Sequence, residues 1–99
     1  DFQNEMVRIV HSQEVKKLIV DDLKQKDSAA FTETGKIQSY EIDDETIEHN
    51  PMGGIMFEVI INRNKEITGG MGLRKYSEDG PIESVGMDES EGLQKLMEE

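Results

Sequence analysis

Four residues near the middle of the chain have side chains that could bind a metal ion. Asp43, Asp44 and Glu48 carry carboxylates and His49 carries an imidazole, all within the stretch EIDDETIEH. Carboxylate oxygens suit hard divalent cations, and an added imidazole suits zinc or manganese. The spacing does not follow the EF-hand pattern, and the only other histidine, His11, is far away in sequence and expected on a helix. A divalent-cation site at these four residues is therefore an alternative hypothesis.

The residues that follow, HNPMGG, are typical of a tight turn between two strands. Pro51 lacks a backbone donor and favours extended geometry at Asn50, so strand pairing should break there. Gly53 and Gly54 can adopt the positive φ angles that a reversal requires. We therefore expect a structural turn that leads into a strand beginning at Ile55.

The same turn could also be a recognition loop, because loops held by rigid strands often carry function. His49, Asn50 and Met52 are the candidate binding residues on this interpretation. A structural role predicts that His49 or Asn50 hydrogen-bonds the neighbouring backbone, whereas a recognition role predicts that His49 and Met52 are exposed.

Motifs for catalysis are weak. The GGMG string of residues 69–72 lacks the Lys-Ser/Thr ending and the following helix of a phosphate-binding loop, so a kinked or bulged strand explains it better. No serine lies in a nucleophile-elbow motif, and only two histidines could act as bases. Among 22 acidic residues no carboxylate pair can be singled out as acid and base. We expect a protein that is not an enzyme and uses no cofactor.

Composition limits the classes of partner. The 99 residues are expected to form one domain, residues 1–99. The net charge of −11 disfavours binding to nucleic acid or to an anionic membrane surface. The chain has no cysteine, which excludes disulfides and thiolate metal sites, and no apolar stretch approaches the ~20 residues of a membrane span. The expected partner is a protein, and the oligomeric state stays open.

Two apolar faces are evident in the first 26 residues. The phase between them changes at His11 and Ser12, and the Ser12 side chain can cap a new helix. The pattern predicts one kinked helix or two helices over residues 3–26. The two faces comprise Phe2, Met6, Ile9 and Val10, then Val15, Leu18, Ile19 and Leu23.

Apolar residues alternate with a period of two after Lys36, which predicts strands. The clearest strand begins at Ile55 and ends at the hairpin turn NRNK. In the strand before it, the alternation slips between Ile37 and Tyr40, which predicts a bulge there.

A third strand contains the glycines of residues 69–72, which predict a bulge or a close backbone approach. We expect Gly80 at a turn position where positive φ is tolerated, then a short fourth strand after Pro81. Asp88 or Ser90 could cap a final helix. The expected fold is α+β: an N-terminal helix or kinked helix pair packed on one face of a three- to four-stranded antiparallel meander, with a short C-terminal helix.

The run FTETGKIQSYEIDDETIEHNPMGGIMFEVIINRNKEI resembles the central part of a family of small exported or lipoprotein-type proteins of Gram-positive bacteria, whose function is uncharacterised. The matching positions are Tyr40, Ile42, Asp43, Ile47, His49, Asn50, Pro51, Met52, Gly53, Gly54 and Ile55. The resemblance implies a precursor with a signal or lipid anchor and an extracellular or cell-envelope location. The start at Asp1 rather than Met allows for a removed leader and is not itself evidence of export. The resemblance and the lack of a catalytic constellation together predict an exported or cell-envelope binding domain with a protein or envelope partner.

Overall fold

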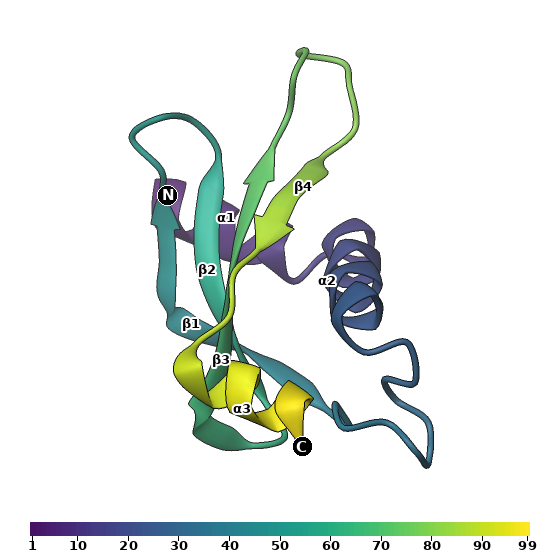
Figure 1. The fold of residues 1–99 in the computed structure, drawn as a ribbon. Coiled ribbons are helices and arrows are strands. Elements are labelled where there is room, and N and C mark those ends of the chain that lie inside the picture. The colour runs from purple at the N-terminus through teal and green to yellow at the C-terminus, as the bar shows by residue number, and fades with distance from the viewer.

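The computed structural model describes all of residues 1–99 and has an α+β fold, as the sequence predicts (Figure 1). Two helices lead into four strands, and a short helix ends the chain. The elements in order are α1 (Phe2–Val10), α2 (Gln13–Lys26), β1 (Tyr40–His49), β2 (Ile55–Ile61), β3 (Asn64–Arg74), β4 (Glu83–Met87) and α3 (Glu91–Glu98).

The N-terminal region forms two helices rather than one kinked helix. The Asp1 side chain caps α1 by accepting a hydrogen bond from the Asn4 amide at 2.8 Å. Ser12 caps α2 by accepting one from the Val15 amide, so the break falls at the predicted change of phase. Each helix buries one apolar stripe, made of Met6 and Val10 in α1 and of Val15, Ile19 and Leu23 in α2.

The loop between α2 and β1 is organised by one carboxylate. Asp27 accepts hydrogen bonds from the amides of Ala29 at 3.1 Å, Lys36 at 2.8 Å and Ile37 at 2.9 Å. The bond from Ile37, with those from Ala29 and Lys36, holds the pKa of Asp27 below its usual value, although burial opposes the shift. Asp27 is the buried charged residue of the fold, and this loop closes around it.

The strands form one antiparallel meander with the order β1-β2-β3-β4. The predicted hairpin turn between β2 and β3 is confirmed, and Asn62 and Arg63 both have positive φ. The Asn62 side chain also accepts from the Gln38 amide at 2.7 Å and donates to the Lys36 carbonyl at 2.8 Å. The turn therefore ties the loop before β1 to the end of the sheet.

One face of the sheet is covered by the helices. α1 packs against β1, α2 against β4 and α3 against β3. Fourteen buried hydrophobic residues from the helices, the loop and the sheet form one cluster. The strands contribute Ile47, Phe57, Val59, Ile61, Met71 and Leu73 to it.

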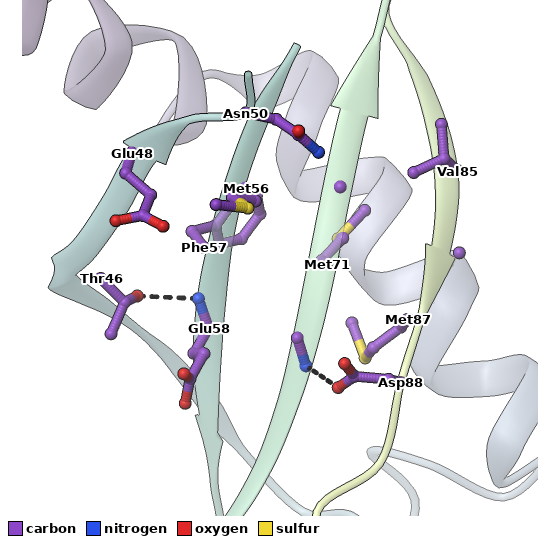
Figure 2. A pocket seen from close by; sticks show the side chains of 13 residues that line it. Thr46, Glu48, Asn50, Met56, Phe57, Glu58, Met71, Val85, Met87 and Asp88 are labelled. Carbon is purple, nitrogen blue, oxygen red and sulfur yellow. Dashed lines mark hydrogen bonds between the residues drawn. The ribbon is translucent and has the colours of Figure 1, made fainter. Parts of the chain in front are cut away.

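The opposite face, called the outer face below, is open to solvent over much of its area. Its β2 and β3 positions include Met56, Glu58, Gly70 and Gly72, which pair across the two strands. The view onto this face shows α1 and α2 behind the sheet (Figure 2). The expectation of one packed face and one wet face is confirmed, apart from Ile60, which is buried.

The last helix is capped by Ser90, one of the two residues predicted to cap it, and the Ser90 hydroxyl accepts from the Leu93 amide at 3.1 Å. Leu93 joins the core. The end of β4 is held by Lys26, whose ammonium donates to the Met87 carbonyl at 2.8 Å and pairs with Glu89 at 3.0 Å. None of the three helices is both long and apolar enough to cross a membrane.

One prediction of backbone geometry is wrong. The bulge expected between Ile37 and Tyr40 lies instead inside β1, between Asp43 and Glu48, because the chain before Tyr40 is not part of the sheet. The turn expected at Gly80 is present, since the Gly80 amide donates to the Ser77 carbonyl at 3.1 Å, and positive φ in this region occurs at Gly86, at +117°. Gly86 takes this conformation where β4 bulges against β3, since two β4 residues there oppose one residue of β3.

Candidate functional site

The HNPMGG turn is a closed, hydrogen-bonded reversal. The Asn50 amide donates to the Gly54 carbonyl at 3.0 Å, and the Gly53 amide donates to the Asn50 carbonyl at 2.8 Å. Asn50 Oδ1 accepts from the Met52 amide at 2.9 Å, which is a side-chain turn typical of asparagine. Gly53 and Gly54 have φ of +106° and +88°, as predicted. The backbone of the turn is therefore determined by its own residues.

The three candidate binding residues differ in their surroundings. Asn50 is half-buried and used by the turn, whereas Met52 is 81% exposed. His49 is exposed, and its ring meets the edge of the Phe2 ring at a centroid distance of 5.7 Å. The structural role of Asn50 and the exposure of His49 and Met52 are thus both found in one turn.

Arg74, at the end of β3, connects this turn to the β3–β4 loop. Its guanidinium donates to the Met52 carbonyl at 2.6 Å and lies 5.7 Å from the centre of the Tyr76 ring. Phe2 and Tyr76 are 65% and 66% exposed. We call Phe2, His49, Met52, Arg74 and Tyr76 the apolar tip. In Figure 1 the N-terminus lies beside the β1–β2 loop, and the β3–β4 loop extends from the same end of the sheet.

The acidic stretch before the turn forms a large bulge in β1. Asp43 pairs with Glu58 and Glu48 pairs with Met56, so four β1 residues oppose one residue of β2. The bulge deprives the Glu58 amide of a backbone acceptor. The Thr46 hydroxyl replaces that acceptor at 2.8 Å and donates to the Asp43 carbonyl at 2.7 Å (Figure 2).

The bulge is also where the N-terminal helices meet β1. His11 Nε2 lies 2.6 Å from Asp44 Oδ1, and Gln3 Nε2 donates to the Ile47 carbonyl at 3.2 Å. His11, expected on a helix and far from the acidic stretch in sequence, lies at the end of α1 and contacts that stretch. The α1–α2 junction brings His11 back onto the strand that carries Asp44.

The four residues of the metal hypothesis have different partners and do not converge on one point. Asp44 pairs with His11, Glu48 faces the outer side of the sheet, and His49 belongs to the apolar tip. The Asp43 carboxylate accepts from the Glu45 amide at 3.3 Å. No group of three or more His, Asp or Glu side chains is placed to hold a metal ion. The geometry gives the cation hypothesis no support.

A groove of about 640 Å³ crosses the outer face (Figure 2). Residues of all four strands and the flanking Asn50 and Asp88 line it, and its central strip is Gly70 and Gly72. Met56 flanks this strip on β2, and Val85 flanks it on β4. We call this feature the outer-face groove.

The last three residues of the GGMG string, Gly70, Met71 and Gly72, line the floor of this groove, where the glycines leave room for neighbouring side chains. A Cβ at Gly70 would approach the Asp88 carboxylate, and one at Gly72 would approach the Val85 side chain. Asp88 Oδ1 accepts from the Gly70 amide at 2.7 Å. The close approach predicted at these glycines is made by side chains, and the bulge lies opposite Gly72 with its extra residue in β4.

The carboxylates Glu48, Glu58 and Asp88 lie along the groove, and no basic residue lines it. Glu58 also borders a second hollow of about 420 Å³ on the same face, which we call the acidic hollow. Its carboxylates are those of Glu41, Asp43, Asp44, Glu45 and Glu58, and its one basic residue is Lys65.

Sequence reasoning missed Arg74, Tyr76 and the outer-face role of Gly70 and Gly72. Side chains alternate between the two faces along each strand, and the hairpin sets how β2 and β3 pair. These two facts could have placed Gly70 opposite Glu58 and Gly72 opposite Met56, on the solvent-exposed face. The contact of Arg74 with the turn depends on which strand ends lie side by side, and no local pattern reveals it.

Comparison with known proteins shows a family and no function. No curated protein and no solved structure matches the chain. Residues 1–96 match the family described as Protein of unknown function (DUF1310). Because this match covers nearly the whole chain, including the turn, the bulge and the groove, the protein belongs to the DUF1310 family.

Proposed function

We propose that the chain is a non-enzymatic interaction domain, whose apolar tip binds an apolar recess on a protein partner. The observation that carries the proposal is the gathering of exposed apolar side chains. Of the four large hydrophobic residues that are exposed, Phe2, Met52 and Tyr76 lie on the segments that form the tip. Apolar side chains grouped on a surface are typical of protein-binding sites.

The tip is ordered before any partner arrives. Arg74 holds the Met52 carbonyl and lies over the Tyr76 ring, while His49 and Phe2 make an edge-to-face contact. The positive-φ glycines and the Asn50 side-chain turn restrict the backbone beneath Met52. Because ordering loops on binding costs free energy, such a surface keeps more of its contact energy as affinity.

The non-enzymatic part of the proposal is supported by how the reactive groups are used. His11 and Asp44 pair between the helices and the sheet. The Thr46 hydroxyl accepts from the Glu58 amide at the bulge, and the Asp27 carboxylate accepts from the Ile37 amide in the loop before β1. These polar groups have structural partners within the fold, which is consistent with a binding domain.

An exported or cell-envelope location is also proposed, and it is supported by the resemblance of the HNPMGG region. The full gene product should be found in the culture medium or envelope fraction of the encoding organism, followed with an antibody against residues 1–99. Recovery of the product from the cytosol alone would contradict this part.

Site-specific photocrosslinking tests the tip. A benzoylphenylalanine placed at Met52, and separately at Tyr76, should capture the same partner in the encoding organism, whereas one placed at the exposed Glu33 should not. Met52→Asp should reduce capture from position 76 by about tenfold, because a charge would be buried in an apolar recess. The matched control Gln25→Asp, on the exposed side of α2, should leave capture unchanged. Different products from positions 52 and 76, or equal capture from position 33, would refute the proposal.

A further inference from the structure

The outer-face groove and the acidic hollow together form a second surface, separate from the apolar tip. The groove offers an apolar and backbone-lined floor around Gly70 and Gly72, with Met56 and Val85 beside it. The hollow lies toward β1 and is dominated by carboxylates. Glu58 borders both, so the two features are adjacent and face the same way.

We propose that this surface binds an extended peptide segment of a partner protein, with an apolar side chain in the outer-face groove and a lysine or arginine in the acidic hollow. Shape supports the first half. Residues from four strands line the groove, and adjacent strands lie ~4.8 Å apart, so its path is about 14 Å long. That length accommodates about four residues of extended chain, at ~3.3 Å per residue.

Charge supports the second half. Five carboxylates line the acidic hollow against one ammonium, that of Lys65. The Asp44 carboxylate is paired with His11, and the Asp43 carboxylate accepts from the Glu45 amide. The Glu41 and Glu58 side chains are exposed on this face. A cationic side chain placed beside them would relieve repulsion between like charges and gain attraction.

The charge also disfavours two other occupants. A second copy of the chain carries a net charge of −11 and would bring further carboxylates to an acidic surface. An acidic peptide or a phosphate-bearing ligand would meet the same repulsion. A basic segment is the occupant whose charge complements this face.

Three blocked hexapeptides provide the test: alternating leucine and lysine, leucine and serine, and leucine and glutamate. Each is titrated into ¹⁵N-labelled protein and followed by amide and methyl NMR. The leucine–lysine peptide should shift the amides of Gly70, Gly72 and Gly86 and the Met56 methyl group, which mark the groove. It should bind at least about tenfold more tightly than the other two, and more weakly as salt rises from about 0.05 M to about 0.5 M.

Charge reversal distinguishes the site from a general attraction to an acidic protein. Glu58→Lys should weaken the leucine–lysine peptide by about tenfold, because Glu58 is shared by both features and its side chain is exposed. Glu33→Lys changes the net charge equally, but lies in the loop before β1, and should change affinity less than about twofold.

Five results would overturn the inference. The first two are equal weakening by the two variants and shifts confined to residues outside the groove. The next two are equal binding of the leucine–serine peptide, and spermidine binding as tightly as the leucine–lysine peptide at the same residues. The fifth is a shift of the groove signals with protein concentration alone, which would identify a second copy of the chain as the occupant. The tip experiment is unaffected by any of these results, because it uses different residues and a different readout.

Discussion

Asp27 should be the polar side chain whose loss costs the fold most. The residue is 9% exposed, and its carboxylate accepts hydrogen bonds from the amides of Ala29, Lys36 and Ile37. Removing the acceptor of a buried amide costs about 1–3 kcal/mol, and of a partly hydrated amide about 0.5–1 kcal/mol. The Ile37 amide is buried and the other two are partly buried. Asp27→Ala should therefore lower the free energy of unfolding by about 2–5 kcal/mol.

Asp27→Asn should fall between the wild type and Asp27→Ala. The single side-chain oxygen of asparagine can accept either from the Ala29 amide or from the Lys36 and Ile37 amides. The side-chain nitrogen then takes the other position, where it faces an N–H donor instead of accepting from it. The expected loss is about 1–3 kcal/mol. Urea denaturation followed by far-UV circular dichroism measures it, with an expected fall in midpoint of about 1–3 M for the Ala variant.

Asp21→Asn is the matched control, because Asp21 is exposed and pairs only with Lys17 at 3.1 Å on the α2 surface. It should change stability by less than about 0.5 kcal/mol. If Asp27→Ala cost no more than this control, the view that one carboxylate organises the loop would be refuted.

The same residue predicts a pH dependence. The pKa of Asp27 is lower in the folded state than its unfolded value of ~3.9, because the Ile37, Ala29 and Lys36 amides favour the charged form. The charged Asp27 carboxylate therefore contributes fully to the free energy of unfolding at pH values above the unfolded-state pKa of ~3.9. This contribution is lost as the pH falls through the folded-state pKa. The stability difference between wild type and Asp27→Asn should narrow between about pH 5 and about pH 2, measured by urea titration. A difference that stayed constant over this range would contradict the assignment.

Further substitutions test the turn and the bulge by thermal and urea denaturation. Gly54→Val should destabilise by about 1–3 kcal/mol, because φ is +88° and a Cβ would overlap the Leu73 carbonyl. His49→Ala should destabilise by less than about 1 kcal/mol, which is roughly the value of its one exposed ring contact with Phe2. If His49→Ala and Gly54→Val cost the same, the view that the glycine backbone determines the turn would be contradicted. Thr46→Val should cost about 1 kcal/mol by leaving the Glu58 amide without its acceptor, and an unchanged midpoint would show that water replaces the hydroxyl.

Local patterns predicted the parts of the fold that depend on local chemistry. The break at Ser12, the cap at Ser90, the reversal at Gly53 and Gly54 and the hairpin at Asn62 follow from side chains acting on their own backbone. Such interactions span a few residues, so a single sequence is sufficient to find them.

Long-range pairings explain what the sequence did not predict. The β1 bulge depends on Thr46 reaching the Glu58 amide and on His11 reaching Asp44, 33 residues away. The turn that carries Asn50 and Met52 was predicted from its own residues, but the neighbours Phe2 and Arg74 come from distant segments. Alternation of apolar and polar residues predicts which side chains share one face of a strand, but not which residues of other segments lie beside them. The apolar tip and the outer-face groove could therefore be identified only from the structure.

The edges of the sheet limit how this protein can associate. An edge strand with free backbone groups invites pairing with another chain. Here α2 lies along the edge strand β4, and its Lys26 donates to the Met87 carbonyl. The β1 edge is interrupted by its bulge, where Gln3 donates to the Ile47 carbonyl. The rest of β1 presents Glu41 and neighbouring carboxylates, which repel an identical strand. Pairing of this sheet with another strand at either edge is therefore disfavoured.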